Sequence, residues 1–224
     1  MSVVVRLRSA VCLLGRFPAL AGVDLDVERG EVVLLSGGNG AGKTTLLRLL
    51  AGLLPLHQGV GEVLGTDLSR DRRSHRRRLA LVGQETFCYD DLTVAENLRF
   101  AARASGSTVE AASDALVALD LGPLADVRHG KLSTGQRRRL ALAIGLARAP
   151  ELLLLDEPHA GLDAPGRAYL DSVLKDAAAN GTSVVLASHE LELMRPVVDR
   201  EVVLVNGQAN GALAAASTPE PAAV

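Results

Sequence analysis

The fold is decided by GGNGAGKTT at residues 37–45. This stretch matches G-x-x-x-x-G-K-[ST] at every fixed position, and it lies between an apolar run at 32–36 and a helical pattern at 43–51, where that motif belongs. Glycines let backbone N–H groups surround a phosphate. The helix that begins there presents its positive end to the anion. The sequence therefore predicts a strand, a phosphate-binding loop and a helix, in that order.

Two side chains of this loop bring further chemistry. Lys43 is expected to reach the β- and γ-phosphates of a nucleotide, and the Thr44 hydroxyl is expected to be a ligand of Mg²⁺. Gly38 stands where related loops often carry proline, so the loop should be more mobile before a ligand binds, with a modest loss of affinity. The alternative is a glycine-rich turn that binds nothing. The residues expected to contact the nucleotide are Gly37, Gly38, Asn39, Gly40, Ala41, Gly42, Lys43, Thr44 and Thr45.

Two acids follow an apolar run in LLLLDE at residues 152–157. Such a run is typical of a central parallel strand, and acids at its carboxyl end face the ligand crevice of an α/β sheet. We expect Asp156 to hold Mg²⁺, directly or through water, and Glu157 to polarise the attacking water. An acidic surface turn is the alternative, and the phosphate loop upstream in the same predicted sheet argues against it.

The order of the remaining patterns indicates the architecture. A β-rich start is followed by a βαβ unit, a helical insertion and a second βαβ unit, which predicts an α/β fold of the P-loop NTPase type with a RecA-like parallel core. We expect an N-terminal antiparallel β lobe, a helical lobe at about residues 90–149, and one domain over residues 1–208. Residues 209–224 are Ala, Pro and small polar side chains and are expected to be a disordered tail. Predicted strands cover 2–8, 23–28, 32–36, 79–83, 152–155, 183–187 and 202–205, with a hairpin at 59–68, and predicted helices cover 43–51, 93–103, 109–119, 134–148, 167–178 and 191–197.

Bulk composition is ordinary for a globular protein and excludes several classes. The formal net charge of -2 offers no strong attraction to nucleic acid, so no nucleic-acid partner is expected. Cys12 and Cys88 are far apart, which argues against a disulfide scaffold and favours a reducing compartment. No window approaches the roughly 20 apolar residues of a membrane span, and the N-terminus lacks the anatomy of a signal peptide. If the protein acts at a membrane, we therefore expect it to do so through a partner protein.

A third segment, LSTGQ at residues 132–136, resembles the signature LSGGQ of ABC-type ATPases, with Thr in the third position. Few other phosphate-loop proteins carry it. The logic is again that of a helix N-terminus, because Ser133 and the following N–H groups offer donors to an anion. In that family the anion is the γ-phosphate of ATP bound by the other subunit of a dimer. The resemblance therefore implies that Ser133, Gly135 and Gln136 contact ATP, and that the chain works as a homodimer or heterodimer of ATPase subunits.

Other family elements occur in the expected order, from about residue 3 to residue 208. Gln84 follows a predicted strand, as the Q-loop glutamine does, and LTVAENL at 92–98 matches the segment after it. AGLD at 160–163 resembles the D-loop, and His189 occupies the place of the switch histidine. The resemblance implies the cofactors ATP and Mg²⁺. The implied site residues are catalytic Glu157, His189 and Gln84, with Thr44, Gln84 and Asp156 at the metal.

The family usually stacks adenine on an aromatic residue of the N-terminal lobe, and this chain departs from that pattern. Counting back from Ala19 and Leu20 gives Leu14 as this position, while Phe17 is the nearest aromatic. Base stacking should therefore be weak. We expect ATP and GTP to bind within about tenfold of each other, a difference of about 1.4 kcal/mol.

Within the family, the chain is similar to the haem-exporter ATPases of cytochrome c maturation. The similarity lies in residues 8–27, 89–100 and 132–142, although Gln84 stands where that group is expected to carry histidine. The resemblance implies export through integral membrane subunits, from a position on the inner face of the cell membrane. ATPases of drug, lipid or polysaccharide exporters remain alternatives, as does a regulatory module without hydrolysis, against which the intact Glu157 and His189 argue. ABC proteins of DNA repair or translation need a long coiled coil or two cassettes, and this sequence has neither.

One basic run has no place in this scheme. RDRRSHRRR at residues 70–78 is expected to be a solvated face. An anionic-lipid contact is the alternative.

Overall fold

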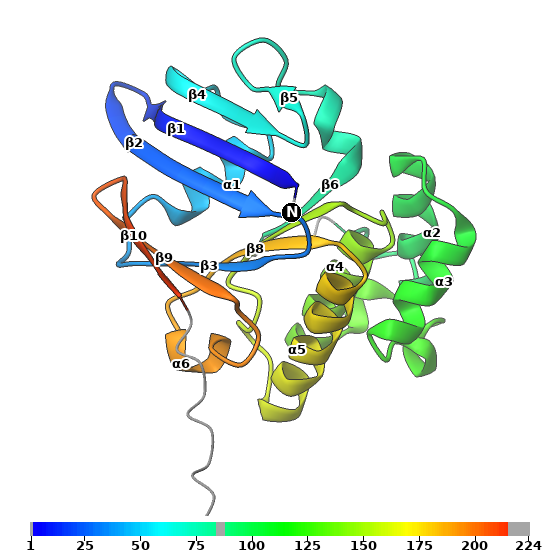
Figure 1. The fold of residues 1–224 in the computed structure, drawn as a ribbon. Helices are drawn as coiled ribbons and strands as arrows, with labels where there is room; N and C mark the ends of the chain where they lie inside the picture. The colour runs from blue at the N-terminus through cyan, green and yellow to red at the C-terminus, as the bar shows by residue number, and fades with distance from the viewer. Residues whose placement is uncertain (1, 84–87, 215–224) are drawn as a thin grey trace, which may run out of the picture.

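The computed structural model describes residues 2–83 and 88–214, without the side chains of 210–214. Two sheets form the centre of the molecule (Figure 1). The antiparallel sheet has the order β2-β1-β4-β5, and the larger sheet has the order β10-β9-β3-β8-β7-β6. The strands are β1 Val3–Leu14, β2 Phe17–Glu28, β3 Val32–Ser36, β4 Gln58–Val63, β5 Thr66–Asp67, β6 Leu79–Val82, β7 Leu152–Asp156, β8 Ser183–Ala187, β9 Arg200–Val205 and β10 Gln208–Ala214.

Helices cover the larger sheet and form a lobe beside it. In Figure 1, α2 and α3 stand to the right of the sheets, while α4 and α5 lie beneath the larger sheet. None of the helices in residues 2–83 and 88–214 combines the length and apolarity that a membrane crossing requires. The α-helices are α1 Lys43–Leu50, α2 Val94–Ser105, α3 Val109–Ala118, α4 Thr134–Leu146, α5 Ala164–Ala179 and α6 Leu191–Met194, and the 3₁₀ turns are η1 Ser74–Arg78, η2 Gly122–Leu124 and η3 His129–Lys131.

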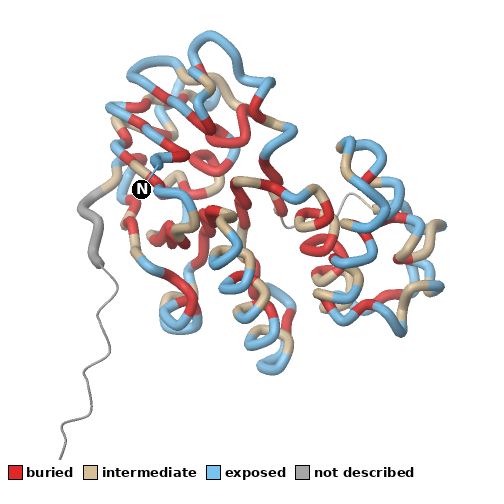
Figure 2. The backbone as a smooth tube through the Cα atoms, turned by 45° about the vertical axis from the view of Figure 1, so that its right-hand side comes forward, coloured by how far each residue is buried: buried red, intermediate tan, exposed pale blue. Residues whose placement is uncertain are grey.

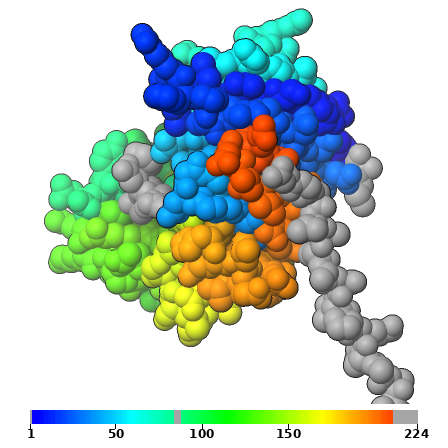
Figure 3. Space-filling model, turned by 90° about the vertical axis from the view of Figure 1, so that its left-hand side faces the viewer, coloured from blue at the N-terminus to red at the C-terminus, as the bar shows by residue number. Residues whose placement is uncertain are grey.

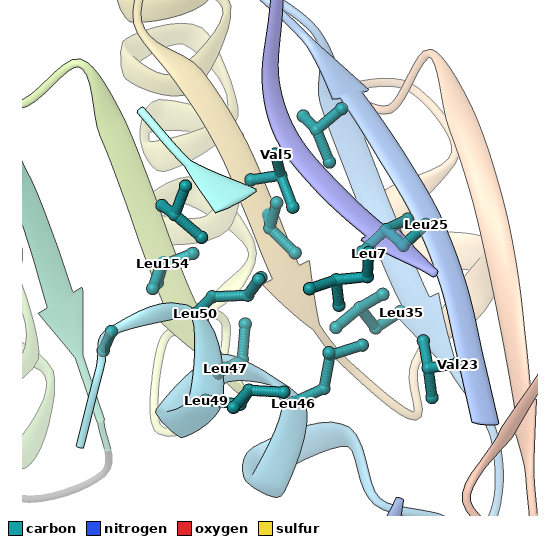
Figure 4. Close-up of a cluster of buried hydrophobic side chains, with 14 of the residues drawn as sticks. Val5, Leu7, Val23, Leu25, Leu35, Leu46, Leu47, Leu49, Leu50 and Leu154 are labelled. Carbon is teal, nitrogen blue, oxygen red and sulfur yellow. The ribbon is translucent and has the colours of Figure 1, made fainter. Parts of the chain in front are cut away.

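The strands β3, β6, β7 and β8 are parallel to their neighbours and buried on both faces. Successive side chains of a strand point to opposite faces, so Val33 and Leu35 pack towards α1 and the antiparallel sheet, while Val32 and Leu34 pack towards the helices on the other side. Figure 4 shows Leu46, Leu47 and Leu50 of α1 among side chains from both sheets. This two-sided burial explains why these strands read as uninterrupted apolar runs.

Figure 2 shows much of the central strands buried, in red, and the outer turns of the helices exposed, in pale blue. Figure 3 shows the phosphate-loop segment and α1, in light blue, in the middle of one face below the N-terminal lobe. The predicted α/β fold with an antiparallel lobe and a helical lobe is confirmed.

Several boundaries differ from the sequence prediction, and two of these differences have a clear local cause. The expected tail from residue 209 is wrong over 209–214, because β10 pairs there with β9 through Asn206 and Gly207, whose φ values of 50° and 75° form the turn. An Asn-Gly pair with both φ angles positive forms a hairpin turn. The strand that follows it, β10, is polar and Ala-rich, so its sequence alone did not predict a strand. Helix α5 begins at Ala164 rather than residue 167, because Asp163 caps it and proline fits its first turn.

Candidate functional site

The loop at residues 37–45 connects β3 to α1, and its glycines are fixed by close approaches. Gly37 has φ +134°, and a Cβ there would lie 2.2 Å from the Leu204 carbonyl oxygen. Gly42, the N-cap of α1, has φ +107°, and a Cβ there would lie 2.8 Å from the Ala19 carbonyl oxygen. An added Cβ at Gly38 would meet no described atom within 4 Å. Two of the glycines are therefore required by shape, whereas Gly38 is free to vary.

Lys43 points its ammonium group back into this loop. Its Nζ donates hydrogen bonds to the carbonyl oxygens of Gly37 at 2.7 Å and Gly38 at 3.2 Å, and the residue is only 9% exposed. The first amides of α1 open on the same space, because the first four N–H groups of a helix have no partner within it. A cation and a set of backbone donors thus converge where a phosphate would lie.

Thr44 and Asp156 meet beneath the loop. The Thr44 Oγ1 hydroxyl donates to Asp156 Oδ2 at 2.9 Å, which joins the start of α1 to the carboxyl end of β7. Hydroxyl and carboxylate oxygens are ligands that Mg²⁺ prefers. Within residues 2–83 and 88–214, no three His, Cys, Asp or Glu side chains are grouped as a metal site. The residues present therefore fit an ion that takes few protein ligands and completes its shell with phosphate and water oxygens.

Glu157 follows Asp156 with φ +49°, in the left-handed region. Its N–H donates to the Ala187 carbonyl at 2.8 Å, at the end of β8. The carboxylate then accepts a hydrogen bond from the buried Ser188 hydroxyl at 3.2 Å and lies 2.9 Å from His189 Nδ1. This carboxylate holds the pKa of His189 above its ordinary value of 6.5. Glu157 and His189 are 32 positions apart in the sequence, and they form one polar pair at the end of the sheet.

Ser188 was not predicted, although it directly precedes His189 and so could have been suspected from the sequence. Gln84 was predicted as a catalytic and metal residue, and it lies outside the described residues. Strand β6 ends at Val82, two residues before this position.

The phosphate loop opens on a cleft of about 300 Å³. Among the described residues, Leu14 lines this cleft and Phe17 does not. Leu14 is 48% exposed at the end of β1, and Phe17 is 80% exposed across the turn. The base end of the cleft is thus formed by a half-exposed aliphatic side chain. Its lining is Leu14, Ala19, Asn39, Gly40, Ala41, Gly42, Lys43, Thr44, Thr45, Asp156 and Glu157.

The signature segment forms the start of α4. Ser133 Oγ accepts from the Gln136 N–H at 3.3 Å, and Gln136 Oε1 accepts from the Ser133 N–H at 2.9 Å, which is a capping box. The amides of Thr134 and Gly135 are left over at the positive end of the helix. An anion at this end would meet those two amides first.

The signature borders a second cleft, of about 550 Å³, together with Gly161, Leu162 and Asp163 of the D-loop segment. The linings of this cleft and of the phosphate-loop cleft share no described residue. The predicted ATP contacts of one chain are therefore divided between two separate surfaces.

The basic run at residues 70–78 is divided by its environment. His75 is buried and bonds the Leu50 carbonyl, and Arg76 bonds the Gly52 carbonyl, so both cover the carboxyl end of α1. Arg78 pairs with Glu151, whose pKa falls to about 2 because Arg78 and Arg29 both donate to it. The rest of the run is exposed, as predicted for a solvated face.

The α/β fold, the phosphate-loop cleft and the signature turn at the start of α4 together define a class, that of P-loop nucleotide-binding proteins. Residues 20–160 match the ABC transporter family, and the chain belongs to it. This confirms the resemblance drawn from the signature.

Relatives support this membership. The chain is 40% identical over 179 residues to "Cytochrome c biogenesis ATP-binding export protein CcmA" of Bordetella bronchiseptica, covering 79% of this chain and 80% of that protein. It is 42% identical over 198 residues to "Putative ABC transporter ATP-binding protein" of Streptomyces avermitilis, where it spans 87% of this chain but only 35% of the relative. The structure titled "Structure of ATP binding subunit of ABC transporter" superposes with a TM-score of 0.86 at 26% identity, over 94% of this chain and 90% of that one. The chain is thus an ATP-binding cassette of the ABC type.

Proposed function

We propose that this chain hydrolyses ATP and thereby drives export across a membrane through separate membrane subunits. The observation that carries the proposal is the pairing of Thr44 with Asp156 and of Glu157 with His189, each at 2.9 Å. Both pairs lie where parallel strands end, next to the ammonium of Lys43. This is the place where α/β sheets bind ligands.

Each of these side chains has a defined task. Lys43 would hold the β- and γ-phosphate oxygens, and Thr44 and Asp156 would hold Mg²⁺, which when bound would neutralise charge that develops on the transferred group. Glu157 accepts a proton from the attacking water as its oxygen bonds to the γ-phosphorus, while the bond from that phosphorus to the β–γ bridging oxygen breaks and ADP leaves. The raised pKa of His189 favours its cationic form beside Glu157, where it can donate to a phosphate oxygen.

A second copy, or a related subunit, would complete the site. The signature cleft and the phosphate-loop cleft are separate in one chain. The free amides at the start of α4 are an anion site of the kind that a γ-phosphate of another copy would occupy. We propose that two such chains close on two ATP molecules, and that hydrolysis reopens them because the two states differ in affinity for the γ-phosphate.

The surface proposed for the membrane subunits is on the helical lobe, at Tyr89 before α2 and Phe100 within it. Tyr89 and Phe100 are 54% and 50% exposed and meet edge to face, with ring centroids 5.2 Å apart. Exposed aromatic pairs are typical of interface anchors. The chain would then work on the cytoplasmic side, bound peripherally to the membrane through this surface. Copurification of Tyr89→Ser and Phe100→Ser variants with membrane proteins should be lost while ATP binding is kept.

For the cargo, the relative named for cytochrome c biogenesis supports haem export or a related step of cytochrome c maturation. The alternative is another ABC exporter, of drugs, lipids or polysaccharides. Deletion of the gene should abolish the covalent haem stain of c-type cytochromes. Normal haem staining in the deletion strain would favour the alternative.

Hydrolysis is tested by Glu157→Gln. This variant should bind ATP, lose phosphate release and form an ATP-dependent dimer in sedimentation. Glu110→Gln, an exposed acid at the start of α3, is the matched control and should hydrolyse ATP at the native rate. Native hydrolysis by Glu157→Gln would refute the role of Glu157. Loss of hydrolysis without an ATP-dependent dimer would refute the composite site.

A further inference from the structure

Arg138 is a buried cation in the first turns of α4, and we propose that it positions the catalytic carboxylate of its own chain according to what the signature turn of that chain binds. The proposal rests on the proposed function, because it gives Ser133 and Glu157 their places in two ATP sites of a dimer. Arg138 lines neither cleft and reaches the site only through backbone carbonyls, so its role is that of a positioning residue.

The surroundings of Arg138 are unusual for a buried cation. The residue is 5% exposed, and each of the four hydrogen bonds recorded for its guanidinium goes to a backbone carbonyl rather than to a carboxylate. A buried charge is costly unless it is hydrogen-bonded, and the planar fork of an arginine can serve several acceptors at once where a lysine cannot. The acceptors are the carbonyls of Gly83, Asp156, Glu157 and Pro158.

These carbonyls belong to the two strand ends next to the site. Gly83 follows β6, and Asp156 ends β7. The Arg138 Nη2 group lies 2.8 Å from the carbonyls of both Asp156 and Glu157. One side chain of α4 therefore holds the carboxyl ends of two parallel strands together.

The contact with Glu157 is the important one, because the backbone of that residue is strained. A non-glycine residue with φ near +50° persists only when its surroundings fix it. The N–H of Glu157 donates to Ala187 at 2.8 Å, and its carbonyl accepts from Arg138 at 2.8 Å and from the Ala160 N–H at 3.1 Å. With both peptide groups held, the carboxylate is directed towards Ser188 and His189. Without Arg138, the Glu157 carbonyl keeps only the longer hydrogen bond from Ala160 and loses the shorter, charge-assisted one.

The same helix carries the signature turn. Ser133 caps α4, and Arg138 lies five residues later, which is about 7.5 Å along a helix axis. A rigid helix transmits a small rotation of its first turn to a residue one and a half turns away. An anion that binds at Thr134 and Gly135 would therefore shift the guanidinium, and with it the Glu157 backbone. In a dimer, that anion is the γ-phosphate held by the other copy, so each site would report its occupancy to the other.

Three variants separate this role from a structural one. Arg138→Met removes all donors, and Arg138→Lys keeps the charge but not the fork. Arg148→Met is the matched control, because Arg148 is also partly buried near the other end of α4 and donates to a backbone carbonyl, that of Arg76 at 2.9 Å, away from both clefts. Thermal unfolding of all three gives the stability cost of losing a buried arginine in this region.

In Arg138→Met we expect kcat to fall about tenfold to a hundredfold, since misplacement of a general base by about 1 Å costs that much. The dissociation constant for ATP should change less than threefold, and the Hill coefficient for ATP hydrolysis should approach 1. Arg138→Lys should recover part of kcat, and Arg148→Met should keep kcat within twofold. Unchanged kcat in Arg138→Met, or an equal loss in Arg148→Met, would overturn the proposal.

A readout independent of hydrolysis is the pKa of His189, followed by NMR in the absence of nucleotide. Loss of the Glu157 contact should lower it in Arg138→Met, as it does in Glu157→Gln, and leave it unchanged in Arg148→Met. If Glu157→Gln lowers this pKa and Arg138→Met does not, the inference about Arg138 is wrong whatever becomes of the proposed function. If the His189 pKa responds to Arg138→Met but the native chain hydrolyses no ATP, the proposed function fails while the positioning contact stands.

Discussion

Replacing Leu14 by tryptophan should strengthen nucleotide binding, because the base end of the cleft lacks an aromatic surface. Leu14 lines the cleft at the end of β1 and is 48% exposed, so a larger side chain fits there without disturbing the core. Stacking of a base on an aromatic ring is worth about 1–3 kcal/mol relative to alanine. Leu14 already supplies part of the apolar contact on one open side, so we expect a gain of about 1 kcal/mol, a roughly fivefold lower dissociation constant.

The assay uses the absence of any other tryptophan in the chain. In Leu14→Trp the single indole should be quenched or shifted as ATP is added, and the titration gives the dissociation constant directly. Phe17→Trp is the control, since Phe17 is 80% exposed and does not line the cleft. Its fluorescence should barely respond to ATP. Competition with a labelled nucleotide gives the affinity of the native chain for comparison.

Base preference is read in the same titrations. The native chain should bind ATP and GTP within about tenfold of each other, a difference of about 1.4 kcal/mol, and Leu14→Trp should improve both, because stacking tolerates every base. The reasoning is refuted if Leu14→Trp leaves the affinity unchanged while Phe17→Trp raises it. A strong preference of the native chain for adenine would equally refute it, because some other group would then read the base.

Three further predictions concern the loop, the pH range and the polar pair. Gly37→Ala should destabilise the fold by about 2 kcal/mol or more in urea unfolding, because it strains a left-handed backbone, whereas Gly38→Ala should stabilise it by about 0.4–1 kcal/mol. The pKa of Glu151 is lowered to about 2, so its ion pairs contribute stability that is complete above pH 4.5 and is lost as the pH falls towards 2. After discounting for exposure, this contribution is about 1 kcal/mol. The free energy of unfolding of Glu151→Gln should lack that part of the acid dependence. The pKa of His189, measured by NMR, should lie above 6.5. The ion pair with Glu157 should be fully formed below pH 6.5 and be lost as the pH rises through the raised pKa. In Glu157→Gln the pKa of His189 should return towards 6.5.

The parts of the fold that could be predicted from the sequence are the strands whose burial on both faces requires an apolar side chain at every position. Residues 32–36 and 183–187 are strands with the predicted bounds, because a strand buried on both faces must be apolar throughout. Strands β1 and β2 were predicted too short, since the added part of β2 carries Pro18 and Gly22, and the added part of β1 begins at Ser9, whose φ is +46°. There the partner strand, rather than the local sequence, keeps the chain extended.

The polar residues that were missed are those whose function depends on tertiary contacts. Arg138 is the middle one of three consecutive arginines, and nothing in its immediate neighbours distinguishes it. Helical spacing does, because Ala141, Leu142 and Gly145 lie three, four and seven residues later and face the core. The same holds for His75 and Arg76, which turn inward to cover the end of α1, a partner that the sequence around them does not reveal.

The two ends of the nucleotide cleft differ in how firmly they are built, and that difference bears on what the chain recognises. At the phosphate end, Lys43 is buried and bonded within the loop, and Thr44 is bonded to Asp156. At the end where the base is expected, the largest apolar side chain of the lining is the half-exposed Leu14. Preorganised donors contribute most to binding because little ordering remains to be done, so the triphosphate should dominate affinity. Such a site distinguishes ATP from ADP better than it distinguishes one base from another. Sensing the γ-phosphate is the discrimination that an opening and closing dimer requires, since only a ligand with different affinity for the two states can shift them.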